Sequence, residues 1–187
     1  MATRYRFDPS RSQFTVQAFA AGVLSFLGHS PTFAVRDFAG WVAFEGGSVH
    51  NVRLELAVRA DSLELTDAVS DKDRREIEGT MRRDVLQTTD YPKIAYEAVK
   101  VSADSVMRGR YRLRIGGRLS LHGVTRPQPV DAELLVFDDG IRLRGESSLR
   151  LSDYQIRPVT ALGGTIRLKD ELRLSFDLAG LGLPEGS

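Results

Sequence analysis

The sequence contains no cysteine and only three histidines among its 187 residues. The absence of thiols excludes a disulfide scaffold, a thiolate zinc site and a cysteine nucleophile. The histidines, His29, His50 and His122, lie far apart and show no HxH, HxxxH or HxxE spacing. Because a catalytic metal needs ligands that converge, we expect no metal site, no catalytic residue and no cofactor.

The chain also has almost no excess of charge of either sign. It carries 26 basic and 25 acidic side chains, a formal net charge of +1. Binding to nucleic-acid phosphates requires clustered lysine and arginine. The densest basic stretch, "RGRYRLRIGGR" (residues 108–118), alternates arginine with apolar residues, as the solvated face of a strand does. The sequence therefore predicts no nucleic-acid partner.

Long apolar runs are missing as well. The most apolar stretch, "AFAAGVLSFLG" (residues 18–28), is far shorter than the ~20 residues that span a bilayer. The first residues, "MATRYRFDPSRSQF", lack the apolar core of a leader peptide. We therefore expect a cytoplasmic protein with no membrane span. If "FAAGVLSFL" (19–27) is exposed, it provides an apolar surface for a homodimer.

Apolar and polar residues alternate through most of the chain. This period of two, with one apolar face, predicts half-buried antiparallel strands. The clearest cases are residues 14–18, 52–58, 111–115, 141–143 and 172–178, and weaker ones are 32–38, 40–44, 94–101 and 130–137. The turn signals between them are "EGGS", "RPQP", "DDG" and "LGG", of which "FDDGI" predicts a short hairpin with positive φ angles. Roughly eight or nine such strands indicate a sandwich or a closed barrel.

One segment, "SDKDRREIEGTMRRDVL" (residues 70–86), breaks this alternation. Its apolar residues recur about every four positions, Ser70 and Asp73 offer a capping box, and its charges suit a solvated outer face. The sequence thus predicts an all-β chain with one amphipathic helix. We expect a single domain with a core at about residues 5–178 and a short tail at 179–187.

Two histidines invite a catalytic interpretation. His29 precedes Ser30 in "FLGHSP", but adjacent strand residues point to opposite faces, and the chain has no GxSxG motif. His122 falls at a strand end on the outer face, where it can hydrogen-bond backbone groups of a turn. We therefore do not expect an enzyme. Two alternatives stay open: a barrel enzyme that uses His29 or His122 as general acid–base on a lipid, and a packed barrel that acts as an interaction module.

Four segments, in this order, resemble the YceI-like family of polyisoprenoid-binding or lipid-binding domains: "FLGHSPTFAVRDFAGWVAFEGG", "VLQTTDYPKIAYEAVKV", "YRLRIGGRLSLHGVTRPQPVDAEL" and "SDYQIRPVTALGGTIRLKDELRLSFDL". The most specific parts are V-L-x-T-x-x-Y-P-x-I at 85–94 and L-x-L-H-G-V-T-x-P at 119–127. The resemblance implies an antiparallel, lipocalin-like β-barrel of eight strands with a helix packed near it. It also implies a carrier or storage role, in which an apolar tunnel holds a polyisoprenoid, an isoprenoid quinone or a fatty-acid amide. Many family members are periplasmic.

Ligand-binding candidates follow from the inward face of such a barrel. Small inward residues, among them Gly117, Gly145 and Ser147, either leave a tunnel or compensate for large neighbours, and the sequence does not separate the two. The apolar candidates are Phe14, Val16, Phe33, Val35, Leu54, Leu56, Met81, Ile115, Leu119, Leu143 and Phe176. The candidates with a polar tip, near strand ends, are His29, Tyr91, Tyr154 and Arg157.

Overall fold

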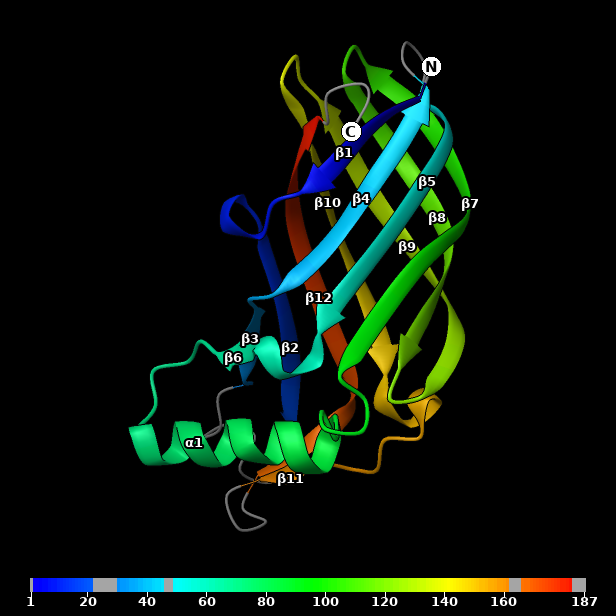
Figure 1. Cartoon of the computed structure of the whole chain (residues 1–187). Coiled ribbons are helices and arrows are strands. Elements are labelled where there is room, and N and C mark those ends of the chain that lie inside the picture. Colours follow the sequence, from blue (N-terminus) through cyan, green and yellow to red (C-terminus); the bar gives the residue numbers. More distant parts are fainter. Residues whose placement is uncertain (1, 22–29, 46–48, 162–165, 183–187) are drawn as a thin grey trace.

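A computed structural model of the chain describes residues 2–21, 30–45, 49–161 and 166–182. Within these residues the backbone forms twelve strands of one antiparallel sheet (Figure 1). The strands are β1 (Ala2–Phe7), β2 (Gln13–Ala21), β3 (Thr32–Val35), β4 (Phe38–Glu45), β5 (His50–Arg59), β6 (Leu63–Leu65), β7 (Lys93–Met107), β8 (Arg110–Leu121), β9 (Val124–Val136), β10 (Gly140–Arg150), β11 (Thr160–Ala161) and β12 (Ile166–Gly182). The helical segments are α1 (Asp71–Thr80), the π-helical turn η3 (Met81–Val85) and the 3₁₀ turns η1 (Pro9–Arg11), η2 (Ala60–Ser62) and η4 (Leu151–Tyr154).

Eight of the strands close into a ring. Their order is β1, β4, β5, β7, β8, β9, β10 and β12, and β12 returns to β1 by pairing Tyr5 with Gly182 and Phe7 with Gly180. In a closed ring each of these strands has a neighbouring strand on both sides. The prediction of an antiparallel eight-stranded barrel accompanied by one helix is therefore confirmed.

The long strand β12 holds the two ends of the barrel together. We call the end with the β7–β8 and β9–β10 turns the upper end, and the end where α1 lies the lower end (Figure 1). β12 pairs with β10 along one edge. Along its other edge it pairs with β1 at the upper end and with β2 at the lower end. The 3₁₀ turn η1 separates β1 from β2, and its Asp8 cap accepts a hydrogen bond from the Ser10 N–H at 2.9 Å.

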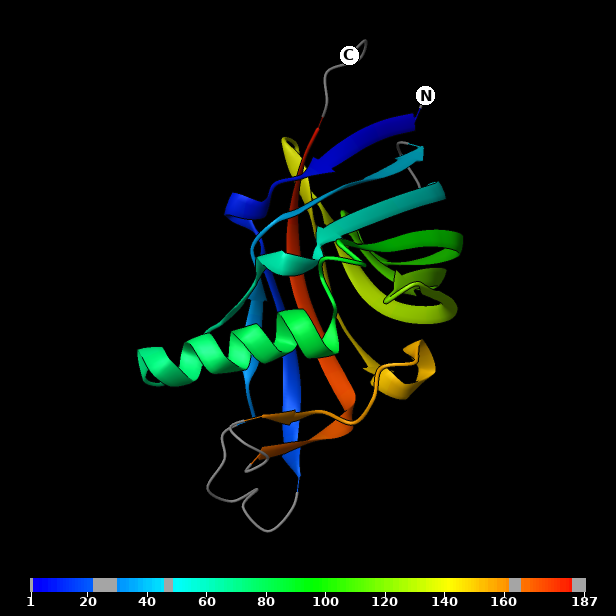
Figure 2. The same ribbon diagram turned by 60° about the horizontal axis from the view of Figure 1, so that its bottom comes forward.

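At the lower end the sheet also extends from β12 through β2, β3 and β6, and α1 packs along the outer edge of β6 (Figures 1 and 2). Edge strands present unpaired backbone groups that need partners. Here Glu78 accepts from the Leu65 N–H at 2.9 Å, Arg74 donates to the Leu65 carbonyl oxygen, and Arg82 donates to the Leu63 carbonyl oxygen at 3.4 Å. The helix was correctly predicted, and Ser70 caps it by accepting from the Asp73 N–H. The expectation that its charges are simply solvated was wrong for these side chains, because the strand edge uses them.

The segment "RPQP" is part of β9 and not a turn, which corrects the prediction. The pairing of β8 with β9 runs without a break through Pro127 and Pro129. Proline has no backbone N–H. At Pro127 and Pro129 the nitrogen that lacks a hydrogen faces β10 and not β8, so the pairing with β8 is kept. Accordingly, the pairing of β9 with β10 stops at Asp131 and Glu146.

Other boundaries also differ from the sequence-based expectations. The hairpin at "FDDGI" is present, with the Phe137 N–H donating to the Gly140 carbonyl oxygen at 2.8 Å. However, residues 138–140 are not among those with positive φ. Strands β1, β6 and β11 were not predicted, and β12 continues through Gly182 into the expected tail. Most of "EGGS", "LGG" and "FAAGVLSFL" lies outside the described residues. Among those residues, no helix has the length and apolar character to cross a membrane.

Tightly packed side chains fill the upper end of the barrel. Val42, Leu113 and Leu134 are fully buried there, and Tyr5 stacks on Phe44 with ring centroids 5.2 Å apart. These residues face one another from strands on different sides of the ring. The upper end is therefore a solid part of the core.

We expect Leu134→Ala to lower the free energy of unfolding by about 2–5 kcal/mol, because it removes buried methyl groups from a packed site. Val99→Ala provides the control, since Val99 is 65% exposed and its loss is expected to cost at most about 0.5 kcal/mol. Urea unfolding of both variants measures the difference. Equal stability of the two variants would contradict a packed upper end.

Candidate functional site

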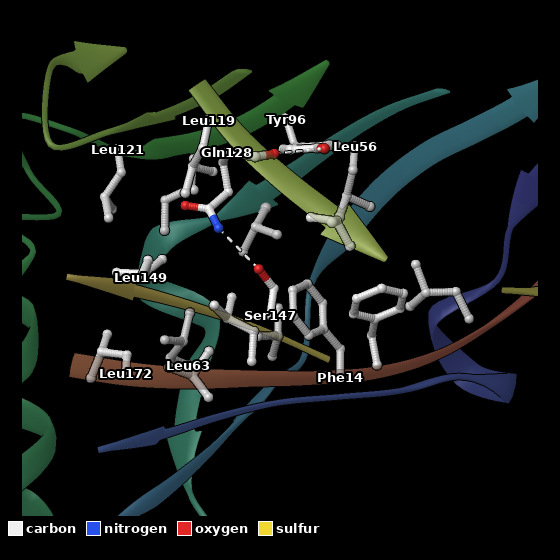
Figure 3. Close-up of a pocket in the computed structure, with 18 of the residues that line it drawn as sticks. Phe14, Leu56, Leu63, Tyr96, Leu119, Leu121, Gln128, Ser147, Leu149 and Leu172 are labelled. Carbon is white, nitrogen blue, oxygen red and sulfur yellow. Dashed lines mark hydrogen bonds between the residues drawn. The ribbon is translucent and has the colours of Figure 1, made fainter. Parts of the chain in front are cut away.

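A cavity of about 160 Å³ lies inside the middle and lower parts of the barrel (Figure 3). Its wall is almost wholly apolar and is formed by Phe7, Phe14, Val16, Val35, Leu54, Leu56, Val58, Leu63, Leu86, Ile94, Tyr96, Ile115, Leu119, Leu121, Gln128, Val130, Leu143, Ser147, Leu149, Leu151, Leu172, Leu174, Phe176 and Leu178. Engineered apolar cavities of ~150 Å³ stay dry and bind small hydrocarbons. This cavity therefore has the size and lining to hold part of an apolar molecule.

Most of the apolar candidates from the sequence line this cavity. They are Phe14, Val16, Val35, Leu54, Leu56, Ile115, Leu119, Leu143 and Phe176. Phe33 and Met81 are buried in the same core but are not among the lining residues. That the lining residues bind a ligand stays a prediction.

The candidates with a polar tip lie elsewhere. At the lower end the Tyr91 ring packs against His122, and the backbone carbonyl oxygen of Tyr154 is paired with His122 Nδ1; neither residue lines the cavity. Arg157 is exposed. His29 lies outside the described residues, so its expected contact with a ligand stays a prediction.

The small inward residues do not all have the same effect. At Gly117 an added Cβ would come within 2.3 Å of the Tyr96 ring, and at Gly145 within 2.7 Å of the Phe176 ring. These two glycines therefore make room for large neighbours. Ser147, in contrast, lines the cavity itself. Both explanations left open by the sequence thus apply, at different positions.

Three of the residues that line the cavity have polar side chains: Tyr96, Gln128 and Ser147. Tyr96 and Gln128 were not predicted from the sequence. Tyr96 donates its hydroxyl proton to the Gln128 backbone carbonyl oxygen at 3.0 Å, and the Gln128 amide nitrogen donates to Ser147 Oγ at 2.9 Å. Gln128 shares the inward face of β9 with Val130, Ala132 and Leu134, so the alternation could have revealed it. It was missed because "RPQP" was interpreted as a turn.

Burial raises the pKa of Tyr96 to about 12. Removal from water disfavours the phenolate, so the side chain stays a neutral hydrogen-bond donor over the ordinary pH range. Burial also raises the pKa of Tyr5 and of Tyr154, and the Asp153 carboxylate adds to the shift at Tyr154.

His122 joins three of the segments that carry the family resemblance. Its Nδ1 lies 3.3 Å from the Tyr154 carbonyl oxygen, and its Nε2 lies 2.8 Å from Gln87 Oε1. Its ring packs against Tyr91 at a centroid distance of 4.5 Å, and Tyr91 also lies over Gly123. The most specific sequence motifs therefore meet at the lower end of the barrel, where they fix the turn between β8 and β9.

The hydrogen bonds of His122 fix the orientation of its ring. A carbonyl oxygen only accepts, so Nδ1 donates to the Tyr154 carbonyl oxygen. Nε2 is paired with the side-chain amide of Gln87. Both ring nitrogens are thus engaged in structural contacts. The expected structural role of His122 agrees with this geometry, although the partner carbonyl belongs to η4 and not to its own turn.

The described residues contain no cluster of three or more His, Cys, Asp or Glu that could hold a metal ion. His50 is exposed at the start of β5.

We expect His122→Ala to lower the free energy of unfolding by about 1–3 kcal/mol, because it leaves Gln87 and the Tyr154 carbonyl without their partner. His50→Ala is the matched control, and its exposed side chain should be removable at a cost within about 0.5 kcal/mol. Chemical denaturation compares the two. A His122→Ala variant as stable as the control would argue against the lower-end contact.

Alkaline pH tests the burial of Tyr96. Its folded-state pKa lies above the ordinary 10.0, so its contribution to stability is complete below pH 10 and is lost as pH rises toward 12. Tyr96→Phe should therefore lose less unfolding free energy than the wild type over this interval, measured by urea unfolding at a series of pH values. Tyr5 and Tyr154 retain their own part of the effect in both proteins. Identical losses would contradict the burial of the Tyr96 hydroxyl.

Some known proteins resemble this chain in sequence, and others resemble it in fold. Protein YceI from Shigella flexneri is 27% identical over 164 residues, which cover 84% of this chain and 78% of that protein. The crystal structure of Burkholderia cenocepacia BcnA superposes with a TM-score of 0.70 at 14% identity and covers 92% of this chain and 98% of that one. A polyisoprenoid binding domain from Saccharophagus degradans gives a TM-score of 0.68 at 13% identity, with 96% and 98% coverage. At these identities the structural matches show a shared fold.

The family profile described as YceI-like domain matches residues 5–179, nearly the whole barrel from β1 into β12. Its extent includes every strand of the closed ring and the cavity between them. The chain therefore belongs to the YceI-like domain family.

Proposed function

We propose that this protein binds a lipid with a long apolar chain and acts as its carrier or store. The observation that carries the proposal is the cavity, in which all but three of the lining side chains are apolar: the exceptions are Tyr96, Gln128 and Ser147. A polyisoprenoid, an isoprenoid quinone and a fatty-acid amide all have the chain that such a wall accommodates. The description of the Saccharophagus relative as a polyisoprenoid binding domain supports this ligand class.

Burying an apolar chain in this cavity is energetically favourable. Each buried methylene contributes roughly 0.8 kcal/mol, so several isoprene units provide substantial affinity even after the cost of ordering the chain. A cavity of about 160 Å³ encloses at most a few isoprene units. A longer ligand therefore requires the lining leucine side chains to change rotamer and widen the cavity.

We further propose that the protein is not an enzyme. Of the residues in the described part of the cavity wall, those with polar atoms are a tyrosine, a glutamine and a serine, and none of them is a general base at neutral pH. His122 lies outside the cavity, with both ring nitrogens in hydrogen bonds. The alternative of a barrel enzyme would thus depend on His29.

The homodimer inferred from "FAAGVLSFL" also stays a prediction, because residues 22–29 lie outside the described part of the chain. Sedimentation at several protein concentrations tests it. A monomer at all concentrations removes the reason for an interaction module.

Protein purified without added lipid should release a hydrophobic molecule into organic solvent, and native mass spectrometry should show the same mass bound. In a binding assay with a fluorescent fatty-chain probe, Leu143→Trp should weaken binding by about 10-fold or more, because the larger ring displaces a few methylenes of ligand from the cavity. Val106→Trp adds the same ring at an exposed position and should bind normally. Protein that is empty and binds neither quinones nor fatty amides would falsify the proposal.

A further inference from the structure

The lower half of the barrel has a seam between β9 and β10. The two strands pair through residues 131–136 and 141–146. Below that point, β9 continues to pair with β8 down to Val124, and β10 continues to pair with β12 down to Arg150. We call residues 124–130 and 147–150 the β9–β10 seam. Pro127 and Pro129 explain it, because they remove the donors that β10 would need.

A side chain replaces the missing backbone pairing at the seam. The Gln128 amide nitrogen, on β9, donates to Ser147 Oγ at 2.9 Å and to the Ser148 carbonyl oxygen at 2.9 Å, both on β10. Tyr96 on β7 lies over Gly117 of β8 and donates to the Gln128 backbone carbonyl oxygen on β9. Figure 3 shows the amide nitrogen of Gln128 turned toward Ser147 and its amide oxygen turned away. We call Tyr96, Gln128 and Ser147 the polar cluster.

One acceptor and one donor of the polar cluster have no hydrogen-bond partner among the described residues. Both amide protons of Gln128 are used, yet its amide oxygen accepts no hydrogen bond from any described residue. Ser147 Oγ accepts from Gln128, and among the described residues its own proton has no acceptor. A purely hydrocarbon occupant would leave these groups unpaired, as they are in a dry cavity, and would gain no hydrogen bond from them. A ligand group that both donates and accepts would satisfy them.

Charge limits which ligand group fits. No lining residue of the cavity, as far as the structure describes it, carries an arginine, lysine or histidine side chain. A carboxylate or phosphate at this depth would lose its hydration without gaining a counter-ion. A neutral hydroxyl or amide loses far less hydration free energy, and hydrogen bonds to the polar cluster compensate for that loss.

We propose that the polar cluster at the β9–β10 seam binds an uncharged hydrogen-bonding group of the lipid, a hydroxyl or a primary amide, inside the cavity. This inference rests on the proposed lipid-binding function and specifies the class of ligand. It distinguishes such a ligand from a free fatty acid or a lipid phosphate, whose charged group is not bound there.

Four probes of matched chain length test the inference: dodecane, 1-dodecanol, dodecanamide and dodecanoate. Displacement of a fluorescent fatty-chain probe measures their affinities. The alcohol and the amide should bind about 3- to 10-fold more tightly than dodecane, the gain expected for one or two added hydrogen bonds. Dodecanoate at neutral pH should bind more weakly than the amide.

Two variants connect the preference to the cluster. Gln128→Met keeps the shape of the side chain and removes its hydrogen bonds, whereas Ser147→Ala leaves the bond from Gln128 to the Ser148 carbonyl in place. Each should reduce the preference for the alcohol and the amide over dodecane, measured as a ratio of affinities within the same variant, to about 2-fold or less. Gln13→Met, at an exposed position of β2, should keep the wild-type preference.

The outcomes separate the two proposals. If dodecane binds as tightly as the alcohol and the amide, if dodecanoate binds most tightly, or if both variants keep the wild-type preference, the inference is overturned and the lipid-binding function stands. If none of the four probes binds, both proposals fall. The expected preference in the wild type, lost in Gln128→Met and Ser147→Ala but kept in Gln13→Met, supports the inference.

Discussion

The backbone hydrogen bonds of β12 hold this barrel together. One edge of the strand pairs with β10 over most of its length, and the other edge is divided between β1 at the upper end and β2 at the lower end. The 3₁₀ turn at Pro9–Arg11 makes this division possible, because it lets the chain leave one part of β12 and resume beside another. Without these pairings the ring would have two open edges, and the apolar interior would face water.

The same requirement for paired backbone groups explains the helix and the seam. Helix α1 brings Arg74 and Glu78, and the following turn η3 brings Arg82, to the edge of β6, where they bond backbone groups that no described strand pairs with. At the seam, the prolines of β9 withdraw donors, and Gln128 bonds the Ser148 carbonyl in their place. At both places, polar side chains form the hydrogen bonds that backbone pairing does not supply. One of these side chains, that of Gln128, also lines the cavity.

Alternation was enough to predict a chain of antiparallel strands, because a strand with one buried face must repeat with a period of two. It left a sandwich and a closed barrel open, and the eight-stranded barrel was implied by the resemblance to the YceI-like family. Alternation also identified much of the cavity wall, from Phe14 to Phe176, since inward parity and cavity lining largely coincide in a barrel. It failed where local signals compete with tertiary structure. The two prolines of "RPQP" indicate a turn in isolation, and only the neighbouring β8 shows that their missing donors face away from it.

Long-range contacts were beyond the reach of the sequence. Tyr91 and Tyr154 have the polar tips of ligand contacts, but both contact His122 from segments that are distant in sequence, Tyr91 through its ring and Tyr154 through its backbone carbonyl oxygen. Likewise, Gly117 appeared able to leave space for a ligand, whereas the Tyr96 ring from β7 occupies that space. Each outcome depends on which neighbour the fold supplies.

The filled upper end gives the cavity a direction. Val42, Leu113 and Leu134 close that end with packed side chains, so a chain inside the barrel cannot pass straight through it. If the barrel holds the lipid chain proposed above, one end of that chain would lie against these side chains, and any excess length would extend toward the lower end. The depth of the cavity would then set how much of the chain the barrel encloses.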